Sequence, residues 1–407
     1  MNARAAPGFL PGIFLFLVLC LGLSACSPQD APPPLTPAAL RQVSPTPGPA
    51  QRQTQAAAAA TPTPIPSPTP WAYATYTPTL PPADLAAAGI NPLTGLPAQE
   101  KSLLEERPVL VKIANWPQTL RPAAGLNQAD LVFEYYIGFQ MNHLTAVFHG
   151  RDCERVGPLA PARMVDARLA EHYQGIVAYA SADSTVEKIF AEVLPERAFA
   201  RGFAPCPAIC TYTDTTGENT FVDTAALRET AGEEEELKLA AERPGFTFDP
   251  RLSHWDADAE TFSLQYADFS VMEWRFDSST DQYVLYQDFA GNGSIDITQS
   301  TDRTDGSRIA FENVLVLFAN YIEYNPTMYD VDFREGDPNQ RALLLRDGKL
   351  IHGTWSSADP FSPINLFSTG GAPLALKPGR TWIVFVGTNS KTTQTSSAAW
   401  ELIFSLQ

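Results

Sequence analysis

The sequence predicts an α+β fold, in which an N-terminal α/β domain with a mixed sheet flanked by helices precedes a mostly β C-terminal domain of sandwich or barrel-like form. Two observations predict it. From Arg107 to about Glu242, segments with the twofold alternation of strands take turns with segments of helical period. From Phe246 onward the helical pattern fades, and strand patterns separated by short turns continue to the end.

Four strands are expected in the first half, each a run of β-branched and aromatic residues. They are "PVLVKIAN" (108–115), "DLVFEYYI" (130–137), "LTAVFHG" (144–150) and "GIVAYASA" (175–182).

Helices are expected between and after these strands. "ARMVDARLAEHY" (162–173) has apolar residues on one side, and "STVEKIFAEV" (184–193) begins with Ser184 as cap and Glu187 three residues on. An acidic run from Glu233 predicts a further, solvated helix that ends at Glu242. This alternation predicts a mixed sheet covered by helices.

The second half predicts a succession of strands and hairpins. The expected strands are "FSVMEWRFD" (269–277), "DQYVLYQDF" (281–289), "ENVLVLFANYIEY" (312–324), "ALLLRDGKLIHGTW" (342–355, with a turn at Asp347 and Gly348) and "GRTWIVFVG" (379–387). We place the N-terminal domain at residues 87–245 and the C-terminal domain at residues 246–407.

The N-terminus has the features of a signal peptide, with Arg4 followed by an apolar run from Phe9 to Leu23. The run ends in "LSAC", which resembles the lipobox of bacterial lipoproteins, whose cysteine is lipidated and becomes the first mature residue. We therefore expect a signal peptide over residues 1–25, a lipidated Cys26 and an extracytoplasmic chain anchored to the membrane. The alternative is a plain secretory signal with an incidental cysteine.

A proline-rich stalk is expected over residues 26–86, since 16 of the 56 residues from 27 to 82 are proline. Proline has no amide donor and fixes its backbone, so the segment cannot form a packed core and is expected to be disordered. A stalk of this kind lifts the folded part away from the membrane.

Composition excludes one class of partner. The formal net charge is -17, and basic residues form no stripe with interleaved aromatics. Such a chain repels nucleic acid, so no nucleic-acid partner is expected.

Three cysteines follow Cys26, which allows one disulfide in an oxidising compartment. We expect the bridge between Cys206 and Cys210, with Cys153 buried and free. No second Cys/His pair stands at ligand spacing, so no zinc site is expected.

Enzyme signatures are missing from the sequence, which has no Gly-x-Ser-x-Gly, His-Glu-x-x-His or phosphate-binding glycine motif. Ser181 follows a strand but lacks the glycines that a nucleophile elbow requires. The stretch from Asp288 to Gln299 resembles a calcium loop at several positions, but it lacks the final bidentate carboxylate. No cofactor, metal or catalytic residue is therefore predicted.

Four polar residues interrupt the strands between Arg121 and His149. His143 and His149 are six residues apart and would share a strand face, as would Asp130 and Glu134. Paired carboxylates can perform acid/base chemistry, and histidines can begin a metal site. In strands, however, such residues more often serve structural hydrogen bonding.

Several stretches together resemble the YerB-like bacterial lipoproteins, which contain a two-part domain of unknown function. They are "NPLTGLP" (91–97), "RPVLVKIAN" (107–115), "RPAAGLNQADLVFE" (121–134), "VGP…AR" (156–163), "TDRTDGSRIAFENVLV" (301–316), "RDGKLIHGTW" (346–355) and "LKPGRTWIVFV" (376–386). The resemblance implies architecture and membrane tethering, with almost no biochemistry.

Departures from that pattern narrow the candidate ligand-binding residues. His143 stands where relatives place an arginine, and Ala160 replaces the first arginine of another motif. Loss of an arginine removes a bidentate anion contact, so any anion would bind weakly or be replaced by another ligand. The candidates are Asn115, Arg121, Asp130, Glu134, His143 and Arg163.

The leading hypothesis is a membrane-tethered lipoprotein with a non-enzymatic binding or scaffolding role at the cell envelope. Its candidate partners are a cell-wall polymer, a lipid-linked intermediate or an envelope protein. The alternative is an envelope hydrolase or transferase acting on an anionic wall or lipid-linked substrate, with Glu134 or Asp130 as base and Arg163 holding the anion. A third hypothesis is that the β-rich C-terminal module docks onto wall polymer or another protein through exposed aromatics such as Trp355 and Trp382. Both, however, stand in strand-like segments, where we expect them to belong to the core.

Overall fold

The computed structural model describes residues 82–406 apart from 215–216, 233–244, 292–293, 327, 334–336, 338–339 and 358–363. All of them belong to one of two units of the chain, the unit that covers Trp71–Gln407. Several predictions fall outside the described residues: the signal peptide, Cys26, most of the expected stalk and the whole of the acidic helix expected from Glu233 to Glu242.

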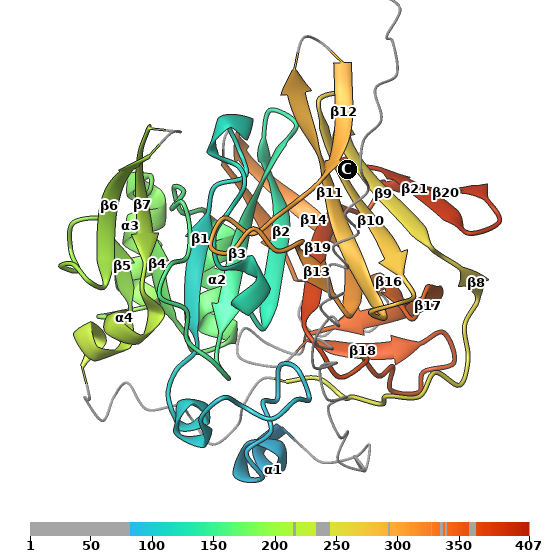
Figure 1. Cartoon of the computed structure of the whole chain (residues 1–407), viewed down its shortest axis with the longest axis horizontal. Helices are drawn as coiled ribbons and strands as arrows, with labels where there is room; N and C mark the ends of the chain where they lie inside the picture. The colour runs from blue at the N-terminus through green and yellow to red at the C-terminus, as the bar shows by residue number, and fades with distance from the viewer. Residues whose placement is uncertain are drawn as a thin grey trace, which may run out of the picture. The chain divides into compact units, whose positions relative to one another are not determined.

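Among the described residues, twelve strands form the larger sheet, and both halves of the chain contribute to it (Figure 1). From one edge to the other the order is β18 (Asn365–Ser368), β17 (Lys349–Ser356), β16 (Gln340–Arg346), β14 (Asn313–Asn325), β19 (Thr381–Gly387), β2 (Leu131–Gly138), β3 (Met141–Phe148), β1 (Val109–Ile113), β4 (Ile176–Tyr179) and β5 (Ala198–Ala200), with β15 (Met328–Asp332) beside β14 and β8 (Ala257–Asp258) beside β17.

Seven further strands of the described chain form the second sheet, and two form a separate hairpin. The second sheet runs β12 (Ser294–Gln299), β11 (Gln282–Gly291), β10 (Ser270–Asp277), β9 (Thr261–Ala267), β21 (Ala399–Ile403) and β20 (Lys391–Ser396), with β13 (Ala310–Phe311) beside β11; the hairpin consists of β6 (Ile209–Asp214) and β7 (Gly217–Val222). The calcium-like stretch is thus part of the antiparallel β11–β12 pair.

The helices are α1 (Pro82–Ala87), α2 (Met164–His172), α3 (Ser184–Val193) and α4 (Thr224–Ala231), with short 3₁₀ turns at Lys101–Glu105, Gln118–Leu120 and Leu126–Gln128. Helix α1 begins in the last residues of the expected stalk and ends one residue beyond it, so residues 82–86 are helical and were wrongly expected to be disordered. Helix α3 has the predicted bounds, but its cap is Asp183 and not Ser184, because the Asp183 carboxylate accepts the amide of Thr185 at 2.8 Å. No helix in the described part of the chain is long and apolar enough to cross a membrane.

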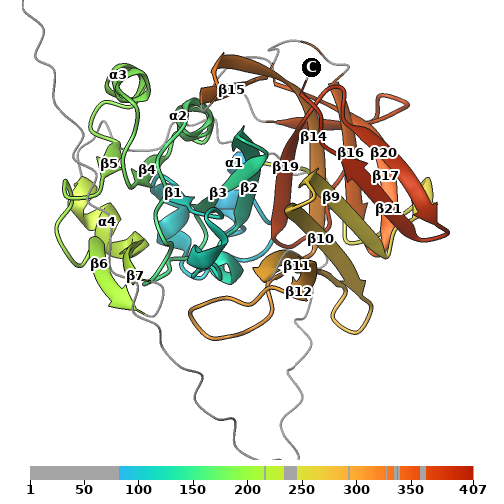
Figure 2. The same cartoon turned by 90° about the horizontal axis from the view of Figure 1, so that it is seen from above.

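The predicted fold class is confirmed: a mixed sheet with few helices in the N-terminal half and mostly β structure in the C-terminal half. Of the described residues, 15% are helical and 47% are in strands. Figure 2 shows α2 and α3 over one face of the larger sheet and β9–β12 over the other. Trp355 and Trp382 are fully buried, which confirms the expectation that they belong to the core and contradicts docking through these two aromatics. Their indoles fill the apolar core, where such large side chains contribute most.

The two halves of the chain are joined by a parallel pair of strands and by hydrogen bonds between side chains and backbone. β19 pairs with β2 in parallel, with Trp382 opposite Val132. Arg303 Nε donates to Pro122 O at 2.8 Å, and Asp302 Oδ1 accepts the amide of Gly125 at 3.0 Å. The stretches that carry the family resemblance therefore contact one another, which gives them a role in the fold.

Candidate functional site

Two buried polar clusters lie on opposite faces of β2. Successive strand residues face opposite sides, so Glu134 and Tyr135 belong to different clusters. Glu134 faces the second sheet, where Trp382 packs on Trp274 with ring centroids 6.1 Å apart. Tyr135 faces α2, where its hydroxyl bonds to Asp166.

The cluster between the sheets is a continuous chain of side-chain hydrogen bonds. Glu134 accepts Trp382 Nε1 at 2.7 Å and also accepts the amide of Asn142. Asn115 Nδ2 donates to Asn142 Oδ1 at 2.7 Å, and Gln287 Nε2 donates to Asn115 Oδ1 at 2.9 Å. Buried polar groups satisfied in this way fix how two surfaces pack.

Arg121 closes one end of this chain. Its Nε donates to Asn115 O at 2.9 Å, and its Nη1 donates to Asp288 O at 2.6 Å and lies 3.4 Å from Asp288 Oδ1. Burial lowers the pKa of Arg121, and the charge of Asp288 opposes that shift. Arg121 is therefore engaged by protein acceptors inside the molecule.

Burial raises the pKa of Glu134 to about 7, although the hydrogen bonds from Trp382 and Asn142 act in the opposite direction. The side chain is fully buried. A carboxyl group in this position is poised to titrate near neutral pH, but its oxygens already accept protein donors.

Asp130 lies apart from Glu134, before the start of β2. Its Oδ2 accepts the backbone amides of His149 and Gly150 at 2.6 and 2.8 Å, which holds the chain as it leaves β3. Burial raises the pKa of Asp130. The two carboxylates share no hydrogen-bond partner among the described residues, so they form no paired acid/base site.

On the helix face, four residues that the sequence prediction missed form a second cluster. Lys112 Nζ lies 3.5 Å from Asp166 Oδ2, and Thr145 Oγ1 donates to Asp166 Oδ1 at 2.6 Å. The hydroxyl of Tyr135 donates to the same carboxylate and accepts from Lys112. Burial lowers the pKa of Lys112 to about 8, opposed by Asp166. The sequence feature that could have indicated this cluster is Lys112, a lysine inside the apolar run "PVLVKIAN".

Arg163 stands at the carboxyl edge of the parallel strands β1 and β4. The segment before it crosses this edge, where Ala160 N donates to Lys112 O at 3.0 Å and Ala162 N donates to Ser181 O at 2.7 Å. Arg163 is the N-cap residue of α2, and its amide donates to Asp166 Oδ2 at 2.7 Å. In open α/β sheets, ligands bind outside the carboxyl ends of the strands.

His143 lies at the same edge, opposite Tyr135 on β2. It is 5% exposed, and its Nε2 is 3.4 Å from Trp116 O. Its Nδ1 and the Nε of Arg163 are buried with no hydrogen-bond partner among the described residues. The pKa of His143 is well below its ordinary value because of burial and the positive charges of Lys112 and Arg163.

The six candidate residues thus separate into three places. Asn115, Arg121 and Glu134 belong to the inter-sheet chain, Asp130 holds the chain after β3, and His143 and Arg163 lie at the carboxyl edge. The positive charge of Arg163 lowers the pKa values of Tyr135, Lys112 and His143, which lie on the side of the sheet away from Glu134. The hydrolase or transferase hypothesis needs Glu134 or Asp130 beside Arg163. Glu134 lies on the opposite face of β2, and Asp130 lies beside His149 and Gly150, so the structure brings neither carboxylate together with Arg163.

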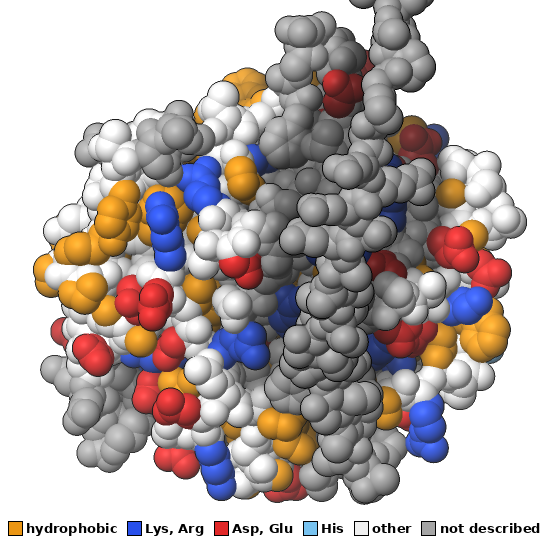
Figure 3. All heavy atoms as spheres, in the orientation of Figure 1, with side chains coloured by type: hydrophobic (Ala, Val, Ile, Leu, Met, Phe, Trp, Pro, Cys, Tyr) orange, Lys and Arg blue, Asp and Glu red, His pale blue; other side chains and the backbone are white. Residues whose placement is uncertain are grey.

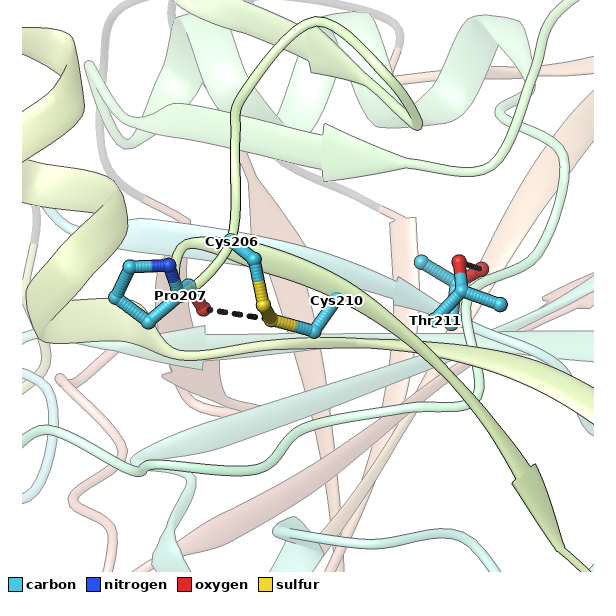
Figure 4. The surroundings of a disulfide bond; sticks show 5 residues. Cys206, Pro207, Cys210 and Thr211 are labelled. Atoms are coloured by element: carbon cyan, nitrogen blue, oxygen red, sulfur yellow. Dashed lines mark hydrogen bonds between the residues drawn. A yellow bond between two sulfur atoms is a disulfide. The ribbon is translucent and has the colours of Figure 1, made fainter.

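A disulfide joins Cys206, in the loop before β6, to Cys210 in β6 itself, with Cα atoms 5.0 Å apart (Figure 4). Cys153 is buried and free, and burial raises the pKa of its thiol to about 11. No group of three or more His, Cys, Asp or Glu residues in the described chain is placed to hold a metal ion. On the face drawn in Figure 3, acidic and basic side chains of the described residues are interspersed.

Comparisons with known proteins extend this description. Residues 93–236 match the model described as "Protein of unknown function (DUF3048) N-terminal domain", and residues 262–383 match its C-terminal domain. The chain is 25% identical over 310 residues to a Bacillus subtilis (strain 168) protein described as "Putative lipoprotein YerB", covering 72% of this chain and 85% of the relative. The crystal structure of the B. subtilis YerB protein has the same fold, with a TM-score of 0.59 and 23% identity, covering 73% of this chain and 96% of that one.

Proposed function

The chain belongs to the DUF3048 family, and on that premise we propose that it is a lipid-anchored extracytoplasmic protein with a non-enzymatic binding role at the cell envelope. The anchor is Cys26, which follows Leu-Ser-Ala at the end of an apolar run. The description of the B. subtilis relative as a lipoprotein supports this anchor. Two or more acyl chains on one cysteine hold a protein at a membrane stably.

The lipid anchor has a direct test. Cells expressing the full chain are grown with labelled palmitate, and the incorporated label is compared between the wild type and Cys26→Ala. We expect label in the wild type only, and release of the Cys26→Ala chain from the membrane fraction. Equal membrane retention of the unlabelled variant would show that another segment provides the anchor.

A binding role is favoured over catalysis by one observation. Glu134, whose pKa burial raises to about 7, is fully buried and accepts Trp382 and Asn142, on the face of β2 opposite Arg163. A general base must come within hydrogen-bond reach of the proton that it removes. Glu134 instead stabilises the contact between the sheets, which leaves the carboxyl edge with Arg163 and His143 as the place for a ligand.

The candidate partners are a cell-wall polymer, a lipid-linked intermediate or an envelope protein. The test is a pull-down from detergent-solubilised envelope with the mature chain, comparing the wild type with Arg163→Ala. Arg251→Ala is the matched control, because Arg251 is an exposed arginine whose ion pair is with Asp249. Loss of one bound species in Arg163→Ala alone supports the proposal, and identical species in all three chains would contradict a role for this edge.

A further inference from the structure

The disulfide between Cys206 and Cys210 has no part in the binding role proposed for the carboxyl edge, and its two cysteines have different surroundings. Cys206 is exposed in the loop before β6, whereas Cys210 is 5% exposed and belongs to β6 (Figure 4). In thiol–disulfide exchange a thiolate attacks one sulfur and the other sulfur leaves, so access to the bridge decides where attack occurs. A thiolate from solvent can therefore reach Cys206, while the sheet shields Cys210.

The bridge is not needed to hold β6 in place. It joins residues only four positions apart, and the chain-entropy contribution of a disulfide falls with the length of the loop that it closes. β6 is held by its ladder with β7, in which Cys210 lies opposite Phe221, and Ala208 O accepts the amide of Asp223 at 3.0 Å. We therefore expect the fold to persist when the bridge is reduced. Exposed disulfides are in general the labile, regulatory or catalytic ones.

Apolar side chains surround the accessible sulfur. Phe203 is 81% exposed and stands three residues before Cys206, so the two Cα atoms lie within about 11 Å of each other. Pro205 and Pro207, on either side of Cys206, are also exposed. A small hydrophilic thiol gains little from an exposed phenylalanine, whereas a protein that presents a thiol can bury the ring on contact. The surroundings of Cys206 therefore favour a protein thiol.

We propose that Cys206 and Cys210 form a thiol–disulfide exchange site for a protein partner that carries two neighbouring cysteine thiols. One thiolate of the partner attacks Cys206 Sγ, the bond between the two Sγ atoms breaks, and Cys210 leaves as a thiolate. The second thiolate of the partner then attacks the partner's own sulfur in the mixed disulfide, which releases Cys206 and leaves the partner as a disulfide.

Two electrons pass from the partner to the bridge in this exchange, and the two protons lost by the partner's thiols end on Cys206 and Cys210. The reverse exchange with a more oxidising disulfide restores the bridge. The linkage is stoichiometric and independent of the carboxyl edge, so it adds to the proposed binding role without replacing it.

Cys210 favours a partner with two thiols. Because β6 fixes its backbone, and its Cα is 5.0 Å from that of Cys206, the Cys210 thiolate stays within reach of the mixed disulfide and can reverse the first step. A single thiol is therefore expelled again unless a second thiol resolves the mixed disulfide. A dithiol partner supplies that second thiol at once.

The lability of the bridge is tested with the mature chain in a neutral detergent. The chain is equilibrated without oxygen in mixtures of reduced and oxidised glutathione, quenched with acid and alkylated in denaturant, and the peptide with both cysteines is measured by mass spectrometry. We expect the mixtures that reduce half of the bridge in the folded and in the urea-unfolded chain to agree within about tenfold. A larger excess of reductant for the folded chain would identify a structural cross-link and overturn the inference. Near-ultraviolet circular dichroism of the reduced chain is expected to match that of the oxidised chain.

The point of attack is tested with two variants, each first shown to be folded by urea denaturation. Cys210→Ser leaves the exposed Cys206 thiol, which we expect to form a mixed disulfide with oxidised glutathione. Cys206→Ser leaves the shielded Cys210 thiol, which we expect to react at least about tenfold more slowly. Equal rates, or a faster reaction of Cys210, would contradict attack at Cys206.

The class of partner is tested by comparing reduced thioredoxin, as a model protein dithiol, with dithiothreitol, a small dithiol. Phe203→Ser is expected to slow reduction of the bridge by thioredoxin several-fold and to leave the rate with dithiothreitol unchanged. Phe139→Ser is the matched control, since Phe139 is 59% exposed in the turn between β2 and β3, and it is expected to slow neither reaction. Unchanged reduction of Phe203→Ser by thioredoxin, or equal slowing with both reagents, would overturn the assignment of a protein partner at this surface.

Discussion

The indole Nε1 of Trp382 donates to Oε2 of Glu134 at 2.7 Å, although the two residues are 248 positions apart in the chain. Both lie on fully buried strands that pair in parallel, β19 and β2. Because this bond joins the two halves of the chain inside the core, the residue that looked most like a catalytic base has a structural role.

Removing the indole donor should destabilise the fold. Trp382→Phe leaves one oxygen of Glu134 without its donor and creates a small cavity, so we expect the free energy of unfolding to fall by about 2–4 kcal/mol in urea denaturation. Trp400→Phe is the control, since its Nε1 bonds to Asp258 O at a more exposed place. Its cost should be about 1 kcal/mol or less. Equal losses of unfolding free energy in the two variants would show that the bond to Glu134 stabilises the fold no more than the exposed bond of Trp400.

Glu134 should make stability depend on pH. The folded-state pKa is raised from 4.5 to about 7, so the unfolded chain releases this proton first as pH rises. The stabilising contribution of protonated Glu134 is complete below about pH 4.5 and is lost as pH rises toward about 7. Urea unfolding at about pH 5 and about pH 8 should show a larger decrease in the wild type than in Glu134→Gln. If the stability of the wild type and of Glu134→Gln changed with pH in parallel, a raised pKa of Glu134 would be contradicted.

The Lys112–Asp166 pair should show strong coupling. Either Lys112→Met or Asp166→Leu leaves the other charge buried without its partner, at a cost of about 3–5 kcal/mol in the free energy of unfolding. The double variant should be more stable than the sum of the single losses predicts, as measured in a double-mutant cycle by urea denaturation. Simple additivity would mean that the two charges do not interact.

Gly348 should tolerate no side chain in the β16–β17 turn. Asp347 and Gly348 both have positive φ, at 55° and 71°, as the two-residue hairpin turn requires. A Cβ on Gly348 would lie 2.9 Å from Phe276 Cδ1. Gly306→Ala is the matched control, with φ of 73° and nothing within 4 Å of the added carbon. We expect Gly348→Ala to lower the melting temperature more than Gly306→Ala, and equal effects would exclude the contact with Phe276.

Most secondary structure was predictable because it depends on local periodicity. The strands at β1, β2 and β14 and the bounds of α3 follow from hydrophobic pattern and turn residues. The cap of α3 was misassigned by one residue, since Asp and Ser are both good caps and only the backbone conformation of Asp183 decides between them.

The candidate site was predictable only in part. Arg163 and His143 were selected as polar residues in otherwise ordinary elements, and the structure places them at one edge of the sheet. Lys112 and Asp166 were missed because neither stands near the other in the sequence, and a lysine in a strand usually faces solvent.

The sequence by itself determined many of the elements, the lipobox-like Cys26 and the family resemblance, because each depends on residues that are neighbours in the chain. Tertiary structure alone decided that β19 lies beside β2, that α2 covers the Tyr135 face and that β9–β12 cover the Glu134 face. These arrangements depend on packing between segments far apart in the chain, which local pattern does not specify. The face on which each polar residue lies, and hence what it can contact, follows from that packing.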